Sequence, residues 1–162
     1  MKLLVVCLGN ICRSPLAEGA LRARIETSPL AGNVEVDSAG TGDWHAGQGP
    51  DPRAVACARE HGVDISGLRA RQLQRSDFDA FDWLLCADAQ NVRDVLSRAP
   101  ANQRDKVVLL TEWAGVDGGS VPDPYTGGEL EFEHAWQLVD SAARAVVQRL
   151  CRDGDCGIIN RR

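Results

Sequence analysis

The sequence predicts a single three-layer α/β domain, in which a four-stranded parallel sheet is flanked by helices on both faces. Short apolar segments rich in β-branched residues alternate with longer segments of helical periodicity, which is the pattern of parallel βαβ units. The chain has 162 residues, close to the most common size of one domain, and 44% of them are hydrophobic, enough to bury a core. We expect the domain to span residues 1–152 and residues 153–162 to form a polar tail.

The clearest expected elements are the first strand and the helix after it. Residues 2–8 form a short apolar run that a Gly-Asn pair stops, which indicates a buried strand. A helix is expected from Ser14 to about residue 26, with Ser14 as its N-cap and Pro15 at its first position. The remaining elements continue the alternation, with strands at 34–38, 82–87 and 106–110, helices at 51–62, 88–98 and 130–151, and long loops at 39–50 and 111–128.

The composition argues against several functional classes. The formal net charge of -5 and the pI near 5.2 do not suit a surface that binds nucleic acid or anionic lipid. No stretch approaches the roughly 18 apolar residues that a membrane span needs, and the opening apolar run is too short for an export signal. We therefore expect a cytoplasmic protein that binds neither nucleic acid nor a membrane.

The cysteine spacing does not indicate a structural metal site. The six cysteines, at 7, 12, 57, 86, 151 and 156, include no C-x-x-C pair. The three histidines, at 45, 61 and 134, are interpreted as lying at no metal-ligand spacing from them. We expect the thiols to be reduced, most of them as small core residues, and we expect neither a metal nor an organic cofactor.

The segment that carries chemistry is residues 7–14, which joins the first strand to the first helix. In an open α/β sheet, ligands bind at the carboxyl ends of the strands, and a helix N-terminus favours an anion there. Gly9 lets the backbone turn without a Cβ, and Asn10 tolerates left-handed geometry. The loop amides of such a segment can curl around one phosphate group.

Cys7, Arg13 and Ser14 complete the phosphate-binding loop of residues 7–14, which forms a cradle for one phosphate group. A helix N-terminus and a nearby cation lower the pKa of a thiol, so the field that binds phosphate favours a thiolate at Cys7. The Ser14 hydroxyl can donate a hydrogen bond to that thiolate, and the Arg13 guanidinium can bind two phosphate oxygens at once. Cys156 and Arg162 show the same Cys-x5-Arg spacing without a strand or helix beside them, so the context of Cys7 carries the inference.

The motifs of the chain resemble those of one family. The run from Cys7 to Glu18 (CLGNICRSPLAE) is followed by DSAG at 37–40, DW at 43–44, DPRA at 51–54, HG at 61–62, RARQ at 69–72 and DPY at 123–125. Together they are similar to the signature of the low-molecular-weight protein tyrosine phosphatases, and the resemblance covers all but about the last ten residues. It implies the phosphotyrosine phosphatase I-like fold.

The resemblance implies hydrolysis of protein phosphotyrosine by double displacement. Cys7 would attack phosphorus to form a cysteinyl-phosphate intermediate while Arg13 and the loop amides hold the equatorial oxygens. Asp123 would protonate the leaving phenolate and then deprotonate the water that cleaves the intermediate. A phenolate with a pKa near 10 leaves slowly without a proton, so such an acid gives roughly 100-fold or more, and activity should peak on the acidic side.

The resemblance also assigns roles around the cradle. Trp44 and Tyr125 would wall the substrate entrance, and Ser38 would brace Asn10. An oxidised Cys7 could be captured by Cys12 as a disulfide. The phosphate-binding loop would comprise Leu8, Gly9, Asn10, Ile11, Cys12 and Ser14. Expected partners are phosphotyrosine proteins, with autophosphorylated tyrosine kinases among the candidates, and phosphate or vanadate should inhibit competitively.

The chain departs from the family pattern, and alternatives stay open. Ser66-Gly67-Leu68 stands where many relatives have a histidine, so a hydrogen bond that supports Asn10 is either missing or replaced. In protein arginine phosphatases on the same fold, the positions of Leu8 and Ile11 resemble threonine, whereas here they form an apolar rim that suits a phenyl ring. An arsenate reductase needs two further cysteines to pass a disulfide outward, and Cys86 stands alone after the third expected strand.

Overall fold

The computed structural model describes residues 1–153 and contains a parallel sheet whose central strand is the first one in the chain. β1 (Lys2–Cys7) is buried from Leu3 onward because its residues are apolar on both faces. It pairs in parallel with β2 (Glu35–Gly40) and with β3 (Trp83–Cys86), and β4 (Val107–Leu109) lies beyond β3. The order is β2-β1-β3-β4, which confirms the four-stranded parallel sheet.

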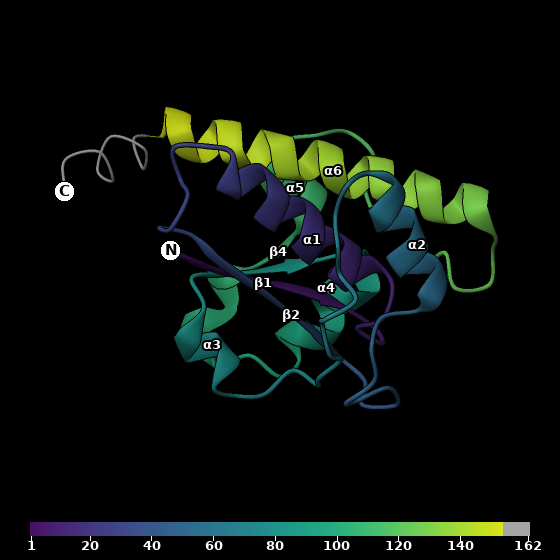
Figure 1. Ribbon diagram of the computed structural model, residues 1–162. Helices are drawn as coiled ribbons and strands as arrows, with labels where there is room; N and C mark the ends of the chain where they lie inside the picture. The colour runs from purple at the N-terminus through teal and green to yellow at the C-terminus, as the bar shows by residue number, and fades with distance from the viewer. Residues whose placement is uncertain (154–162) are drawn as a thin grey trace.

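Helices cover both faces of this sheet (Figure 1), so the predicted three-layer α/β class is confirmed. The long α6 lies across α1 and α2 on one side of the sheet. α4 lies against β3 and β4. The helices are α1 (Arg13–Glu26), α2 (Pro52–Glu60), α3 (Asp77–Ala80), α4 (Ala89–Leu96), the 3-10 helix η1 (Ala101–Lys106), α5 (Leu110–Ala114) and α6 (Glu129–Arg152).

Alternate residues of the central strand belong to two separate cores. Leu3 and Val5 pack into the larger core, which the apolar residues of α1, α2, α5 and α6 complete. Leu4 and Val6 pack into the smaller core on the other face, with Phe78 and Val95. These four side chains of β1 are fully buried. Close packing on both faces holds the strand rigidly in place, and with it the start of the loop that follows.

The start of the first helix differs from the prediction. α1 begins at Arg13, its N-cap is Cys12, and no side chain caps it. The prediction of Ser14 as N-cap is therefore wrong. The Ser14 hydroxyl lies 3.0 Å from Cys7 Sγ and accepts from the Asn10 side chain, so it serves the loop and is not available as a cap.

Two short α-helices, besides the 3-10 helix η1, lie in segments where no helix was predicted. α5 occupies the start of the expected loop 111–128, where Trp113 and Ala114 bury their side chains against the larger core. α3 lies in the acidic segment before β3 and buries Phe78 in the smaller core. Both helices have five residues or fewer, which is too short for a helical period to stand out in the sequence.

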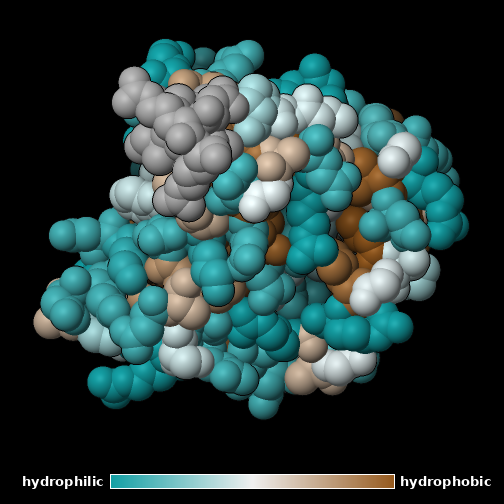
Figure 2. Space-filling view, turned by 60° about the vertical axis from the view of Figure 1, so that its left-hand side comes forward, coloured by the Kyte–Doolittle hydropathy of each residue, from teal (hydrophilic) through white to brown (hydrophobic). Residues whose placement is uncertain are grey.

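The face in Figure 2 is largely hydrophilic, and the hydrophobic residues visible on it lie in gaps between polar ones. No helix within residues 1–153 is long and apolar enough to cross a membrane. Cys151 is disulfide-bonded, so the expectation of reduced thiols is wrong there. The expected tail, with Cys156, lies outside the described residues except for Asp153.

Candidate active site

A pocket of about 180 Å³ lies at the carboxyl end of β1 and contains the residues expected to be catalytic. Both entrance residues predicted from the sequence also line it. The position agrees with the rule that open parallel sheets bind ligands where their strands end. The pocket is lined by Cys7, Leu8, Gly9, Ile11, Cys12, Arg13, Trp44, His45, Asp123 and Tyr125.

The loop of residues 7–14 makes a tight turn over the end of the sheet. Asn10 has φ of 57°, the left-handed region that a non-glycine residue rarely adopts. This turn points the Asn10 backbone N–H at Cys7 Sγ, at 3.3 Å. Gly40 at the end of β2 makes room for the turn, because a Cβ there would lie 2.7 Å from the Leu8 carbonyl oxygen. The sequence therefore shapes this turn from both strands.

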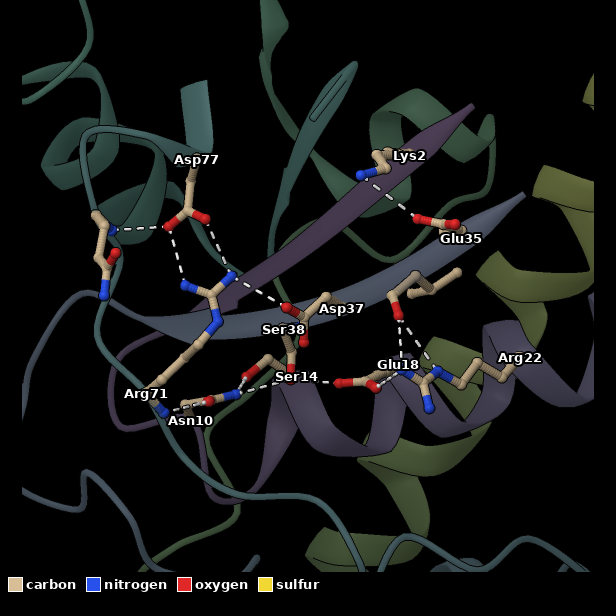
Figure 3. Close-up of polar contacts among 12 residues, drawn as sticks. Lys2, Asn10, Ser14, Glu18, Arg22, Glu35, Asp37, Ser38, Arg71 and Asp77 are labelled. Atoms are coloured by element: carbon tan, nitrogen blue, oxygen red, sulfur yellow. Dashed lines mark hydrogen bonds and ion pairs between the residues drawn. The ribbon is translucent and has the colours of Figure 1, made fainter. Parts of the chain in front are cut away.

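The Asn10 side chain is held from three sides (Figure 3). Its Nδ2 donates to Ser14 Oγ at 2.7 Å and to Ser38 Oγ at 2.9 Å. Its Oδ1 accepts a 3.0 Å bond from the backbone N–H of Arg71. The Ser38 contact is the one implied by the family resemblance. The backbone N–H of Arg71 thus supplies a hydrogen bond to Asn10 in this protein, which lacks the histidine that many relatives have. A backbone donor has no signature in the sequence, so this contact could not be predicted.

A buried carboxylate continues this network behind the loop. Ser38 Oγ donates to Glu18 Oε1 at 2.6 Å, and Glu18 Oε2 lies 2.7 Å from the Arg22 guanidinium. Burial raises the pKa of Glu18, although Ser38 and Arg22 oppose that shift. On the opposite side of Asn10, the Arg71 guanidinium bridges Asp77 and Asp37. The loop thus rests on a chain of charged and polar contacts that reaches the surface.

Cys7 lies beneath the pocket with its sulfur held by two hydrogen-bonding groups. Its side chain is buried, and Sγ is 3.0 Å from Ser14 Oγ as well as 3.3 Å from the Asn10 backbone N–H. Donors of this kind stabilise a negative sulfur more than a neutral one. The arrangement therefore suits a nucleophilic thiolate.

Arg13 is a buried cation that meets two carboxylates. Its Nη1 donates to Asp88 Oδ2 at 2.5 Å and to the Val121 carbonyl at 3.1 Å, and its Nη2 lies 3.7 Å from Asp123 Oδ2. Burial by itself lowers the pKa of Arg13, but the negative groups that face it, Cys7, Asp88 and Asp123, raise it by more. The pKa of Arg13 therefore lies above its ordinary value. The guanidinium stays charged in the pocket.

Asp88 was missed by the sequence reasoning. It follows Ala87 directly after β3 and caps α4, with its Oδ1 accepting from the Asn91 backbone N–H at 2.7 Å. Its other oxygen anchors Arg13. Its place beside the carboxyl end of a strand next to β1 was a usable signal, because ligand-binding residues of parallel sheets gather at that edge.

Asp123 lies in an exposed loop that Arg53 ties to α2. The Asp123 side chain is 46% exposed, and its Oδ1 accepts from the Tyr125 backbone N–H at 3.1 Å. Arg53 donates to the carbonyls of Tyr125 at 2.9 Å and Gly127 at 3.0 Å, and it pairs with Asp51 at 2.8 Å. Arg53 belongs to the DPRA motif, which by itself indicates no role for it. Its contacts fix the loop that carries Asp123.

The rim of the pocket is apolar and aromatic. Trp44 is 67% exposed and Tyr125 50% exposed, an unusual exposure for side chains of their size. Leu8 is also exposed at the rim, whereas Ile11 is buried against the wall. His45, which the sequence reasoning left without a role, lines the same pocket, with its ring 6.5 Å from the Tyr125 ring.

Two further findings concern cysteines. Cys12 lines the pocket, and burial together with the Asp51 charge raises the pKa of its thiol to about 12, so it stays protonated near neutral pH. Cys57 of α2 and His61, which caps the C-terminus of that helix, lie four residues apart in the sequence, which is a metal-ligand spacing, and Glu133 of α6 joins them. The expectation that no histidine lies at such a spacing from a cysteine is therefore wrong.

Comparisons with known proteins point to one family. The family model described as low molecular weight phosphotyrosine protein phosphatase matches residues 2–155. A low molecular weight protein-tyrosine-phosphatase of Streptomyces coelicolor is 45% identical over 147 residues, covering 88% of each chain. The structure is similar to a protein tyrosine phosphatase from Entamoeba histolytica, with Hepes in its active site, at a TM-score of 0.90 and 34% identity over 94% of this chain and 98% of that one.

A third relative was solved with a ligand. Vibrio vulnificus Wzb in complex with benzylphosphonate matches at a TM-score of 0.81 and 33% identity, and the match covers 92% of this chain and 98% of that chain.

Proposed function

The chain belongs to the low molecular weight phosphotyrosine protein phosphatase family, and on this premise we propose that it hydrolyses phosphotyrosine in proteins through a cysteinyl-phosphate intermediate. One observation carries the proposal. Cys7 and Arg13 of the loop 7–14 and Asp123, more than a hundred residues later in the chain, line one pocket at the carboxyl end of β1. They are a nucleophile, a cation and a carboxyl group, which are the three groups that this reaction requires.

The first step transfers the phosphoryl group to Cys7. The thiolate attacks phosphorus, the bond between phosphorus and the phenolic oxygen breaks, and Asp123 donates its proton to that oxygen. Asp123 suits this role because it lies at the exposed side of the pocket, where the leaving group departs, while Cys7 lies beneath.

The second step returns the enzyme to its starting state. Asp123, now ionised, takes a proton from a water molecule as that water attacks phosphorus, and the sulfur leaves as a thiolate with inorganic phosphate as the product. The Ser14 hydroxyl, 3.0 Å from Sγ, stabilises the departing thiolate. The same carboxyl group thus acts as acid and then as base.

Arg13 and the loop amides bind the phosphoryl oxygens in both steps. Asp88 and the Val121 carbonyl hold Nη1 of Arg13, so the guanidinium is positioned before the substrate arrives. Such preorganised donors stabilise charge that develops in the transition state. Inorganic phosphate and vanadate fill the same cradle and should inhibit competitively.

An aromatic substrate fits the rim better than a guanidinium. Leu8 and Ile11 offer apolar contacts, and the exposed rings of Trp44 and Tyr125 can lie against a flat ring. The relative bound to benzylphosphonate holds a ligand of this shape, a phenyl ring joined to a phosphonate through one methylene group. We therefore favour phosphotyrosine over phosphoarginine. Phosphotyrosine proteins, including autophosphorylated kinases, are the substrates we propose.

Thiol-dependent arsenate reduction is the weaker alternative. It requires cysteines that pass a disulfide from the cradle to the surface. Cys86 is fully buried and belongs to the smaller core, whereas Cys7 belongs to the larger one. Burial also raises the pKa of the Cys86 thiol far above its ordinary value. It is a packing residue of the smaller core.

The test is hydrolysis of a phosphotyrosine peptide beside a phosphoarginine peptide of the same sequence context, without added metal. The Cys7→Ser protein is the control. We expect cleavage of phosphotyrosine alone, lost in the variant. Preference for phosphoarginine would refute the substrate assignment, and activity in Cys7→Ser would refute the nucleophile.

A further inference from the structure

Three metal-ligating side chains converge between α2 and α6, away from the pocket described above. Cys57 lies on α2, His61 is the residue that caps the C-terminus of α2, and Glu133 lies on α6; the two helices pack together (Figure 1). One ligand atom of each residue lies within 4.8 Å of the other two. A thiol, an imidazole and a carboxylate are a donor set typical of zinc.

The distances between these atoms come close to those of a coordination sphere. Cys57 Sγ is 3.7 Å from Glu133 Oε2, and His61 Nε2 is 2.8 Å from the same oxygen. Zinc–ligand bonds of about 2.0–2.3 Å place neighbouring ligand atoms of a tetrahedron roughly 3.3–3.7 Å apart. The sulfur–oxygen pair already fits this spacing, and the nitrogen–oxygen pair has to open by roughly half an ångström.

Two neighbouring side chains orient the ligands. The His61 ring stacks on Trp136, with the centroids 5.0 Å apart and the planes 13° apart. Gln137 donates to Glu133 Oε1 at 2.8 Å, which turns the carboxylate. Outer contacts of this kind hold ligands in the direction that a metal needs. They also lower the entropy that the side chains lose on binding.

The cluster opens to solvent on one side. A hollow of about 480 Å³ is lined by all three residues together with Glu60 and Glu129. His61 and Glu133 are partly exposed, at 30% and 39%, while Cys57 is buried at the base. An ion can therefore enter, the two acidic side chains favour a cation, and a water molecule can take the fourth position.

From this geometry we propose that Cys57, His61 and Glu133 form a binding site for a single Zn²⁺ ion that links α2 to α6. The ion replaces the hydrogen bond between His61 and Glu133 and displaces the thiol proton of Cys57 to solvent. Burial and the Glu133 charge raise the pKa of that thiol to about 11, so the site binds more weakly than one with a preformed thiolate. The proposal does not depend on the phosphatase function.

The test is a titration of the untagged full chain with Co²⁺, a spectroscopic substitute for Zn²⁺. It is done in the Cys7→Ser background, which removes the thiolate of the active site as a competing ligand. We expect one Co²⁺ per chain with a thiolate-to-cobalt charge-transfer band that Zn²⁺ abolishes. Cys57→Ser should remove the band, and His61→Ala and Glu133→Gln should each weaken binding at least tenfold.

His134→Ala is the matched control, because His134 is an exposed histidine adjacent to Glu133 on α6, and it should leave the titration unchanged. A band that persists in Cys57→Ser, or binding that Glu133→Gln leaves intact, would overturn the proposal and leave the His61–Glu133 contact as a plain hydrogen bond. Because Glu133 is partly exposed, we expect the Glu133→Gln protein to fold. Its titration therefore decides the proposal even if Cys57→Ser does not fold.

Discussion

The backbone N–H of Arg71 donates a 3.0 Å hydrogen bond to the side-chain oxygen of Asn10 and so ties the loop of residues 7–14 to a segment 61 residues later in the chain. Asn10 is the only non-glycine residue with a positive φ between residues 1 and 153. A left-handed conformation costs a residue with a side chain about 1–2 kcal/mol. The contacts with Arg71, Ser14 and Ser38 offset this cost.

Replacing Asn10 tests whether its side chain or its backbone shapes the loop. Asn10→Ala loses three hydrogen bonds and keeps the strain, so we expect about 2–4 kcal/mol lower stability in urea unfolding and at least tenfold lower kcat. Asn10→Gly removes the same hydrogen bonds but relieves the strain, and it should be the more stable of the two. An Asn10→Ala protein as stable as the wild type would contradict this account.

Arg53 is expected to act on catalysis through the loop that carries Asp123. Arg53→Lys keeps the charge but cannot bond the Tyr125 and Gly127 carbonyls as a fork. We expect kcat/KM, which covers the transfer of the phosphoryl group to Cys7 and not the later hydrolysis, to fall about tenfold on a phosphotyrosine peptide, because a displaced Asp123 protonates the leaving group poorly. The fall should be much smaller on p-nitrophenyl phosphate, whose leaving group needs less protonation.

Arg59→Lys is the control for that comparison, since Arg59 is an exposed arginine on the same helix. It should behave like the wild type on both substrates. An equal loss on both substrates in Arg53→Lys would mean that Arg53 does not act through Asp123.

Asp140 should make stability depend on acid pH. Burial alone raises its pKa, but Arg24, bonded to both oxygens at 2.9 Å, and Arg144 outweigh burial and hold the pKa of Asp140 below its ordinary value. A carboxyl group whose pKa is lower in the folded than in the unfolded protein stabilises the fold at pH values above its unfolded pKa of about 4. That contribution to stability is lost as the pH falls through the pKa of the folded state. We expect Asp140→Asn to cost about 1–3 kcal/mol at pH 7 and much less near pH 2. Equal losses at both pH values would contradict the ion-pair explanation.

Cys12 is expected to protect Cys7 from irreversible oxidation. Peroxide oxidises the Cys7 thiolate to a sulfenic acid, and the Cys12 thiol then displaces water from it to form a disulfide. We expect the peroxide-treated wild type to recover most of its activity with dithiothreitol and Cys12→Ser to recover much less. Mass spectrometry of the oxidised wild type without a Cys7–Cys12 disulfide would refute this prediction.

The sequence predicted the sheet and most helices because their signals are local. The apolar run of β1, the Asp51-Pro52 helix start and the Gly-Asn turn depend on residues a few positions apart. The short α5 escaped prediction because its stability comes from burying Trp113 in tertiary packing. The Ser14 N-cap was predicted wrongly because a partner across the loop, Cys7, takes up its hydroxyl.

The candidate site was predictable where a motif carries the residue. Cys7, Arg13 and Asp123 lie in recognisable sequence contexts and meet in the pocket. The support of Asn10 by the Arg71 backbone N–H was not predictable, because every non-proline residue offers such a donor. Only the three-dimensional fold selects which donor is used.

The central claim is that Cys7 becomes phosphorylated during the reaction. The most direct measurement is rapid acid quenching of Asp123→Asn with p-nitrophenyl phosphate, whose leaving group departs without a proton donor, followed by proteolysis and peptide mass spectrometry. Without the carboxyl group to activate water, the intermediate should accumulate, and we expect phosphate on the peptide that contains Cys7. Release of phosphate at the same rate with no phosphorylated Cys7 peptide would contradict the mechanism.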